Sequence, residues 1–248
     1  MGAALVAPFG LVIGSFLNVV AYRVPLKKSI AFPGSYCPAC ETPVKAYDNV
    51  PVLSWLVLRG RCRACGERIS PRYPAVELLT ALAFIAVVLV NGVNARLALE
   101  LPFVAILIAV SEIDLEHRII PNRILAPAAV WGLAAGAVVR TDQLPELLIA
   151  GAGAFGFLLL AALIQPKGMG MGDVKLAGVM GLYLGASVAP AMLIGFLTGS
   201  IVGIAMFARY GVAARKMGVP FGPFLALGGF VALLAGPALI HLYTHHLL

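Results

Sequence analysis

The sequence predicts an all-α membrane protein that crosses the bilayer about eight times and carries one small polar segment between its first two helices. Of the 248 residues, 61% are hydrophobic and only 12% are charged, whereas a soluble domain has about half apolar and about a quarter charged residues. Apolar stretches recur along the chain, and the basic residues gather in alternate loops between them. These three observations exclude an ordinary soluble domain.

Eight stretches are apolar enough for transmembrane helices, which need about 20 residues to cross a hydrocarbon core of about 30 Å. They cover residues 3–22, 75–92, 97–113, 124–139, 146–165, 174–188, 190–208 and 221–240. A soluble core helix would explain any one of them, but eight in succession indicate a membrane domain. The fourth and sixth are short and the sixth nearly touches the seventh, so seven or nine spans would also fit. The first lacks a charged leading region, so we expect it to be retained.

The basic residues predict the orientation, because cytoplasmic loops are enriched in lysine and arginine. With eight spans and the N-terminus outside, 16 of the 18 basic residues fall in inner loops, and only Arg96 and Arg140 fall outside. The inner loops are residues 23–74, 114–123, 166–175 and 209–220. We therefore expect both termini outside. The net charge is +7, but the sequence has no motif of the kind that reads the grooves of nucleic acids, so no nucleic-acid partner is predicted.

All four cysteines lie in the cytoplasmic segment 23–74, as Cys37-Pro-Ala-Cys40 and Cys62-Arg-Ala-Cys65, separated by 21 residues. Paired Cys-x-x-Cys turns with such a spacer are typical of tetrahedral zinc sites. Because cytoplasmic thiols stay reduced, zinc is favoured over two disulfides or unpaired structural thiols. Four protein ligands predict a structural ion. Its binding would supply folding energy to a segment too small for much of a core.

Two aspartates at the inner ends of predicted helices are candidate catalytic residues. Asp114 closes the third apolar stretch, and Asp173 opens the sixth after a glycine-rich run. Charges at such positions are costly and therefore informative. Two carboxylates that meet in a partly dry site share a proton, so one can act as a general base on water and the other as a general acid. The alternative is that each aspartate caps or flanks a helix.

These motifs resemble the type IV prepilin peptidase family. Gly170-Met171-Gly172-Asp173 with Lys175 resembles the G-x-G-D signature of intramembrane aspartic proteases, and Asp114 followed by Ile120-Pro121-Asn122 resembles the first aspartate motif. Further similar elements are Gly14-Ser15-Phe16-Leu17-Asn18, Asn49-Val50-Pro51, Leu58-Arg59-Gly60-Arg61-Cys62, Ile69-Ser70-Pro71-Arg72-Tyr73-Pro74 and Pro220-Phe221-Gly222-Pro223-Phe224. The resemblance runs in order from about residue 10 to residue 230.

The resemblance implies a bifunctional enzyme of the bacterial inner membrane whose active site faces the cytoplasm. Such enzymes cleave the leader from type IV prepilins and type II secretion pseudopilins, then methylate the new N-terminal amine with S-adenosylmethionine. It implies Asp114 and Asp173 as the catalytic pair, Gly170, Gly172 and Lys175 as supporting residues, and no catalytic metal. Expected partners are prepilins or pseudopilins and the lipid bilayer.

The methyltransferase half has less support in the sequence. There is no Rossmann-type glycine fingerprint, so S-adenosylmethionine would bind near the cysteine segment and the membrane boundary. Asn49, Gly60, Arg72 and Glu77 are candidates through their place in the resembling segment. Glu77 could orient the amine or accept its proton, or could pair with Arg72 at the interface. Lys175 could pair with an aspartate or a substrate carboxylate, or reach lipid phosphates.

The predicted organisation is a first helix at 1–22, a methylation-associated four-cysteine segment at 23–74 and a seven-helix membrane domain at 75–248 that carries the aspartates. Two alternatives stay open. One is a peptidase that does not methylate, and the other is a transporter whose acids move protons or ions. A transporter should have repeated halves and broken helices near the midplane, whereas here the acids lie at one boundary and no repeat is visible.

Overall fold

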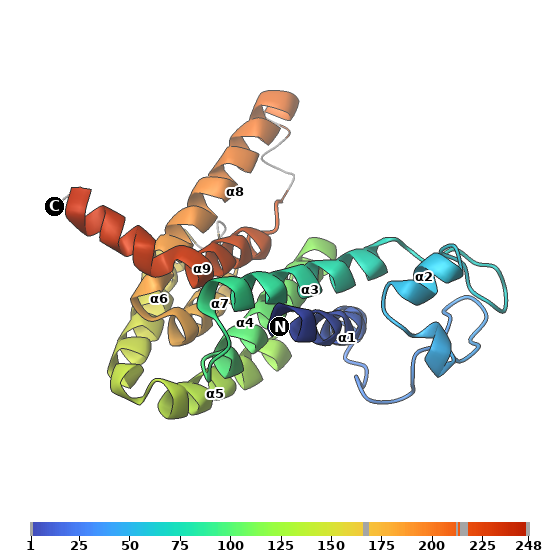
Figure 1. Cartoon of the computed structure of the whole chain (residues 1–248). Helices are drawn as coiled ribbons and strands as arrows, with labels where there is room; N and C mark the ends of the chain where they lie inside the picture. The colour runs from blue at the N-terminus through green and yellow to red at the C-terminus, as the bar shows by residue number, and fades with distance from the viewer. Residues whose placement is uncertain (1, 166–168, 212, 214–217, 247–248) are drawn as a thin grey trace. The chain divides into compact units, whose positions relative to one another are not determined.

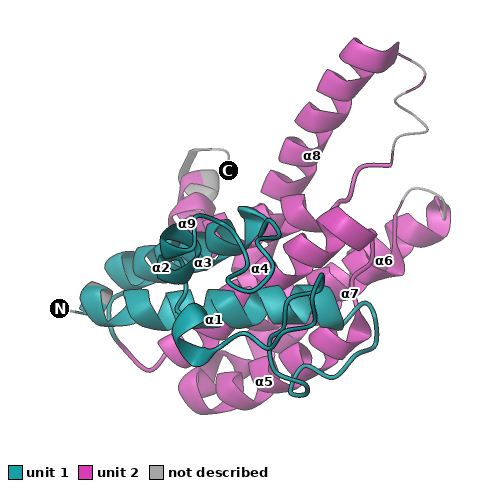
Figure 2. Cartoon of the chain, turned by 90° about the vertical axis from the view of Figure 1, so that its right-hand side faces the viewer, with its two compact units in different colours: residues 1–93 teal, residues 94–248 magenta. Residues whose placement is uncertain are grey.

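The computed structural model is all-helical, as the sequence predicts (Figure 1). It describes residues 2–165, 169–211, 213 and 218–246. Three basic residues that support the predicted orientation, Lys167, Arg215 and Lys216, lie outside the described residues. Contacts divide the chain into two compact units, Met1–Val93 and Asn94–Leu248 (Figure 2).

The first unit is built on a pair of helices, α1 (Gly2–Arg23) and α3 (Arg72–Asn91). Small residues let these helices approach closely: a Cβ on Gly10 would lie 2.6 Å from the Cα of Ala81, and one on Gly14 equally close to the Cα of Glu77. Such spacing is typical of membrane helix pairs. The segment between them contains only η1 (Ala46–Asp48) and α2 (Leu53–Val57) as helical elements.

The described part of the second unit contains six longer helices and two short 3₁₀ turns. They are α4 (Leu97–His117), α5 (Asn122–Val139), η2 (Thr141–Gln143), α6 (Leu144–Ile164), α7 (Met171–Leu184), η3 (Gly185–Ser187), α8 (Val188–Tyr210) and α9 (Gly222–His246). α4 ends where Arg118 enters the left-handed region at φ 55°, and α5 begins after Pro121. α7 ends at Gly185 with φ 58°, a conformation that suits glycine.

The core of the second unit forms around Tyr183 of α7. Its ring stacks on Phe103 of α4 at a centroid distance of 4.8 Å, and its hydroxyl donates to the carbonyl of Ala128 in α5 at 2.7 Å. On the other side of α7, a Cβ on Gly181 would lie 2.6 Å from the Cα of Gly151 in α6. These contacts fix α7 between α4, α5 and α6.

Within the described ranges of the chain, six helical stretches are long and apolar enough to cross a membrane. They are Ala4–Arg23, Arg72–Asn91, Asn122–Val139, Thr141–Ile164, Met171–Tyr210 and Gly222–Leu242. Each of the eight predicted apolar stretches coincides with one longer helix, but the count of about eight spans is not confirmed. Two features explain the difference: α4 carries too many acids to qualify, and α7, η3 and α8 together form one apolar stretch of 40 residues.

The packing groups α3 with α1, and the predicted division at 22/23 and 74/75 does not coincide with the contact boundary after Val93. The predicted division separates membrane helices from the cysteine segment and the aspartates from the cysteines, whereas the boundary after Val93 reflects residue contacts alone. The predicted division therefore stays a prediction. Between α1 and α3, the chain buries few side chains. The segment therefore lacks an apolar core, as its length predicts.

Candidate functional site

Four helix ends surround the two aspartates in the second unit. Asp114 lies in the last turn of α4 and Asp173 in the first turn of α7, while Ile120 leads into α5 and Gly222 opens α9. The N-terminus of a helix carries unpaired backbone N–H groups and a partial positive charge, which favours nearby anions. The helix ends thus form a polar junction suited to carboxylates.

The carboxyl group of Asp114 is buried against the start of α9. The side chain is 5% exposed, and its Oδ2 accepts a hydrogen bond from the Gly222 N–H at 2.9 Å. A Cβ on Gly222 would lie only 2.7 Å from that oxygen. Position 222 therefore needs glycine for the backbone to reach the carboxylate. The charge of Arg118, one turn further on, also acts on Asp114.

Asp173 is held by the turn that starts α7. Its N–H donates to the Gly170 carbonyl at 3.1 Å, and the Gly170 N–H donates back to Oδ2 of Asp173 at 3.3 Å. This reciprocal pair resembles a capping box, and the side chain is 9% exposed. Asp114 lies near enough for its charge to act directly on Asp173. The structure thus brings the two predicted aspartates together.

The glycines before Asp173 have different roles. A Cβ on Gly172 would lie 2.8 Å from the Cβ of Ile120, so glycine lets α7 pack against the chain entering α5. A Cβ on Gly170 would lie 3.2 Å from Oδ2 of Asp173, so a larger residue there would press on the carboxylate. Gly168, the third glycine of the run, lies outside the described residues.

Lys175 points to a different partner from those that the sequence suggested. Its Nζ donates to Oδ1 of Asn122 at 3.0 Å, which joins α7 to the first residue of α5. This bond places Lys175 in the framework of the junction and ties the motif around Asp173 to the one that follows Asp114.

The four cysteines of the first unit form a cluster that fits a metal ion. The sulfur atoms of Cys37, Cys40, Cys62 and Cys65 all lie within 4.8 Å of one another. Those of Cys37 and Cys65 are 3.8 Å apart, close to the edge of about 3.8 Å of a tetrahedron with Zn–S bonds of about 2.3 Å. All four are free thiols. The donor set fits zinc, as predicted.

The two Cys-x-x-Cys turns are structural repeats of each other. In each, the first cysteine donates its N–H to the carbonyl five residues on, Cys37 to Thr42 and Cys62 to Glu67, at 3.0 and 2.8 Å. An antiparallel bridge closes each turn, Tyr36 with Pro43 and Arg61 with Arg68. Two equal turns that face each other supply two thiolates each.

Hydrogen bonds favour the thiolate at two of the four cysteines, Cys40 and Cys62. Bonds with the side chain and backbone of Thr42 lower the pKa of Cys40 to about 6, and backbone bonds from Cys65 and Ala64 lower the pKa of Cys62. At Cys65 the backbone bond from Glu67 acts in the same direction, but bonding with the thiol of Cys40 and burial raise the pKa to about 12. A lowered pKa favours the thiolate, which is the form that binds metals.

The same segment also contains an ion pair. The Arg63 guanidinium holds the Asp48 carboxylate through a bidentate pair, with NH2 to Oδ1 at 2.6 Å, and this pair lowers the pKa of Asp48.

Of the candidates for methyl transfer, Glu77 has the best-defined environment. It lies in α3, is 7% exposed, and its Oε2 accepts the N–H of Val52 at 2.7 Å. The Ser15 hydroxyl also bonds to it. Val52 has φ 62°, a strained conformation for a β-branched residue. Glu77 therefore anchors the start of α2 to the pair of membrane helices.

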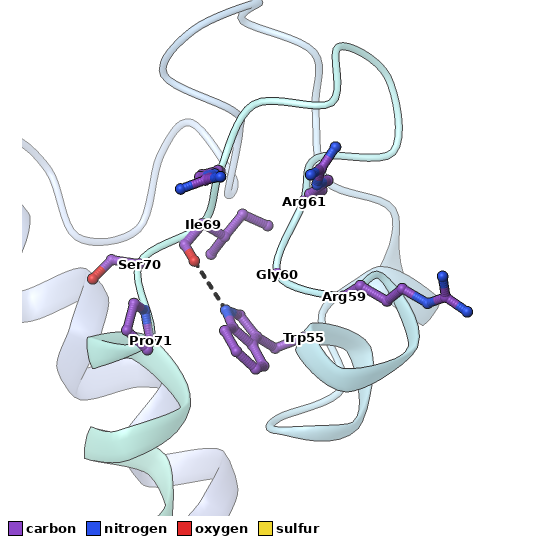
Figure 3. A pocket seen from close by; sticks show the side chains of 8 residues that line it. Trp55, Arg59, Gly60, Arg61, Ile69, Ser70 and Pro71 are labelled. Carbon is purple, nitrogen blue, oxygen red and sulfur yellow. Dashed lines mark hydrogen bonds between the residues drawn. The ribbon is translucent and has the colours of Figure 1, made fainter.

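The remaining candidates lie apart in the segment. Gly60 lines a cavity of about 460 Å³ with Trp55, Ile69 and Pro71, and the Trp55 indole N–H donates to the Ile69 carbonyl at 3.0 Å (Figure 3). Asn49 ends η1, and Arg72 is the first residue of α3. Of the four candidates, only Gly60 lines this cavity.

Sequence reasoning gave no role to several residues that shape both sites. Gly222 was noted only within a motif, and Val52 and Trp55 were not singled out. Arg23 is 6% exposed and donates to the carbonyls of Ser29, Pro33 and Gly34 at 2.7 to 3.1 Å. A backbone hydrogen bond or a positive φ at a residue other than glycine leaves no mark on one sequence, although an arginine at the end of an apolar stretch, next to a long polar segment, is a weak signal.

Comparisons with known proteins agree with the two units. A family model described as "Bacterial Peptidase A24 N-terminal domain" matches residues 9–91, and one described as "Type IV leader peptidase family" matches residues 101–207. A "Prepilin leader peptidase/N-methyltransferase" of Bacillus subtilis (strain 168) is 37% identical over 95% of both chains. One of Aeromonas salmonicida (strain A449) is 36% identical over 99% of this chain and 94% of its own.

A "Type 4 prepilin-like proteins leader peptide-processing enzyme" of Escherichia coli is 36% identical over 90% of both chains. No solved structure matches the chain.

Proposed function

Because the chain belongs to the type IV leader peptidase family, we propose that it removes the leader peptide from prepilins or pseudopilins and then N-methylates the new N-terminus. The observation that carries the peptidase half is that two buried carboxylates, Asp114 and Asp173, lie at one junction of helix ends, near enough for the charge of Asp114 to act on Asp173. We assign these two residues as the catalytic pair. Gly170 and Gly172 shape the turn around them, and Lys175 braces it through Asn122.

The pair supports hydrolysis of a peptide bond by water. The ionised carboxylate removes a proton from the water as its oxygen attacks the scissile carbonyl, and the protonated carboxyl gives its proton to the carbonyl oxygen. The carboxyl that took the proton from water then gives it to the leaving nitrogen, and a hydroxyl of the resulting diol returns its proton to the other carboxylate, so that the C–N bond breaks, a free amine forms and the pair is regenerated. The Gly222 N–H holds one oxygen of Asp114 in place throughout.

The free amine produced by cleavage is the substrate of the second reaction. When bound, S-adenosylmethionine would supply the methyl group to this nitrogen and be released as the neutral thioether, while the methylated amine would give up one proton. We propose that residues 23–74 support this step, with zinc on the four cysteines as the structural ion and Gly60 in the cavity beside them. Asn49, Arg72 and Glu77 would position the segment on α3; Glu77 does so through Val52.

We also propose eight membrane crossings, with the aspartates and the cysteine segment facing the cytoplasm and both termini outside. In α4, Glu100 and Asp114 are only 4% and 5% exposed. These acids make the sequence of α4 less apolar, but they are buried in protein and so do not oppose a membrane crossing as lipid-facing acids would. The stretch Met171–Tyr210 is interrupted at Gly185–Ser187, which supports two helices rather than one. Reporter fusions after Arg118, Arg140 and Ala186 would test this topology.

One assay tests the function. Purified protein is incubated with a prepilin and S-adenosylmethionine, and the product is measured by mass spectrometry. We expect loss of the leader and a gain of one methyl group at the new N-terminus. A cleaved but unmethylated product would indicate a peptidase without methyltransferase activity, and an unprocessed prepilin would contradict the proposed function.

A further inference from the structure

A second cavity, of about 470 Å³, lies in the second unit at the ends of α4 and α7 that are away from the aspartates. Its lining includes Arg96, which directly precedes α4, and Arg140, which directly follows α5. These are the two basic residues that the predicted orientation leaves outside. The structure places both on the wall of one cavity.

Two acids lie near these arginines, but they form no ion pair with them. The charges of Glu100 and Glu146 both act on Arg140, as does that of Arg96. Within the described residues, neither acid is in an ion pair with either arginine. The four charges thus share one region of the unit without direct pairing.

Two buried polar atoms of this group lack a hydrogen-bond partner among the described residues. They are Oε2 of Glu100, a residue that is 4% exposed, and Nε of Arg140. Nη1 of Arg140 donates to the Tyr183 carbonyl at 3.1 Å, which fixes the guanidinium at the cavity wall. Burying a charged group without a partner is costly. An anion in the cavity beside Arg140 would offset this cost through charge-assisted hydrogen bonds.

Another part of the lining is apolar and comes from α9. Leu233, Pro237 and Ile240 line the cavity at the i, i+4 and i+7 spacing of one helix face. The lining therefore follows α9 over about two helical turns. A ligand that fills the cavity needs an apolar part as well as a charged one.

The charged end of the cavity is expected at a membrane boundary. Arg140 lies between Asn122–Val139 and Thr141–Ile164, two stretches that are each long and apolar enough to cross a membrane. Lipid headgroups lie at this level of a bilayer. A ligand with a charged head beside Arg140 and apolar chains along α9 has the character of a phospholipid.

The charges favour a zwitterionic headgroup over an anionic one. Two guanidinium groups suit a phosphate, and Glu146, which also lines the cavity, supplies a negative charge for an ammonium group. Oε1 of Glu146 accepts the Ala186 N–H at 2.9 Å, which holds the carboxylate in place and leaves its second oxygen for another donor. A headgroup without a cation would leave this carboxylate beside a phosphate.

We propose that this cavity binds the headgroup of a phosphatidylethanolamine, with its phosphate at Arg96 and Arg140 and its ammonium at Glu146. The first part of its acyl chains lies along α9. The volume of about 470 Å³ is in the range of small-molecule sites, about 300–1,000 Å³. The lipid contacts the start of α4 and the end of α7, the two helices whose other ends carry the aspartates. Binding requires neither the proposed reactions nor a particular orientation of the chain.

Competition between lipids measures this selectivity directly. Full-length protein is placed in nanodiscs with equal parts of phosphatidylethanolamine, phosphatidylglycerol and phosphatidylcholine, and the lipids that stay bound after release into detergent are identified by native mass spectrometry. Phosphatidylglycerol lacks the ammonium, and the trimethylated ammonium of phosphatidylcholine cannot donate a hydrogen bond. We expect the wild type to retain phosphatidylethanolamine about threefold to fivefold over each of the others, as for an exposed ion pair.

Two variants test the two ends of the headgroup. Glu146→Gln keeps an oxygen for the Ala186 N–H and loses only the charge, so the preference over phosphatidylglycerol should disappear. Arg96→Gln should reduce retention of all three lipids by about threefold, because it removes one exposed partner of the phosphate. Asp142→Asn is the matched control, since Asp142 is an exposed acid in η2 that does not line the cavity, and it should behave as the wild type. Thermal unfolding and prepilin cleavage show whether the variants are folded.

Three outcomes would overturn the assignment. Equal retention of the three lipids by the wild type would remove the headgroup site, and preferential retention of phosphatidylglycerol would assign the cavity to an anionic lipid instead. Unchanged lipid retention in Glu146→Gln and Arg96→Gln, together with weaker binding of a prepilin, would assign the cavity to the substrate.

Discussion

The N–H of Gly222 donates a hydrogen bond of 2.9 Å to Oδ2 of Asp114 across 108 residues of sequence. It couples the start of α9 to the end of α4 at the point where catalysis is proposed. The bond comes from the backbone of a glycine, and a Cβ at this position would lie 2.7 Å from the same oxygen and so displace the carboxylate. α9 therefore positions the carboxylate as well as completing the membrane domain.

Gly222→Ala should reduce cleavage without unfolding the protein. The added methyl group displaces the carboxylate and weakens a charge-assisted hydrogen bond worth about 1.5–3 kcal/mol, so we expect a loss of about tenfold or more in the cleavage rate. Alanine favours helix more than glycine does, so thermal stability should hold. Gly153→Ala is the control, because a Cβ there meets nothing within 4 Å. Equal cleavage by both variants would contradict a positioning role for Gly222.

Asp114→Asn and Asp173→Asn should each abolish leader cleavage. Asparagine keeps the shape but cannot exchange the proton, and acid–base catalysis contributes about 10²–10⁴-fold. The measurement is the rate of prepilin processing, with zinc content and thermal unfolding as checks on the fold. Asp142→Asn, at an exposed acid in η2, is the control. The catalytic assignment fails if either active-site variant processes the substrate at close to the wild-type rate.

Replacing any one of the four cysteines by serine should release zinc and loosen residues 23–74. A structural zinc site supplies folding energy to a segment without its own core, so we expect proteolysis of this segment to become faster. Methylation should fall at least as much as cleavage, because the aspartates belong to the other unit. Elemental analysis and mass spectrometry of the product measure both effects. Unchanged zinc content in the variants would disprove the metal site.

Because the two cysteine turns repeat each other, the backbone strain at one position can be compared between them. Gly66 and Glu41 follow the second cysteine of each turn, at φ 76° and 56°. A residue with a Cβ costs roughly 1–2 kcal/mol in this region, so Gly66→Ala should lower the stability of the zinc-bound segment by about 1 kcal/mol.

Glu41→Gly should raise that stability by a smaller amount, because glycine also adds entropy to the unfolded chain. Zinc release to a chelator measures the two effects. Gly34→Ala is the control, since it has open space and an ordinary φ. Equal zinc release from Gly66→Ala and Gly34→Ala would show that the turn carries no backbone strain at this position.

The sequence predicts the helices well because membrane helices depend on local apolar composition. The predicted stretch 97–113 lies within α4, and 174–188 covers α7 from Val174 onward and continues through η3 to the first residue of α8. Counting crossings is harder, because the cost of an acid such as Glu100 depends on whether it faces lipid or protein, and a break such as that at Gly185 depends on tertiary contacts.

The sequence predicts those parts of the candidate sites that are made of side chains. Asp114, Asp173 and the four cysteines stand out by residue type and spacing, and the structure brings each set together. The contribution of Gly222 is a backbone N–H from a distant helix, and that of Val52 is a strained φ. Such features are set by packing, so one sequence cannot reveal them.

Glu77→Ala should detach the start of α2 from α3. The half-buried Val52 N–H would lose its acceptor at 2.7 Å, which costs up to about 1–3 kcal/mol, and the strained conformation of Val52 would lose this support. We expect faster proteolysis between residues 49 and 60 and a parallel loss of methylation. Glu77→Gln keeps an oxygen acceptor and should retain most of both, because the role is one of anchoring. If the glutamine variant resists proteolysis but no longer methylates, Glu77 takes part in proton transfer from the amine instead.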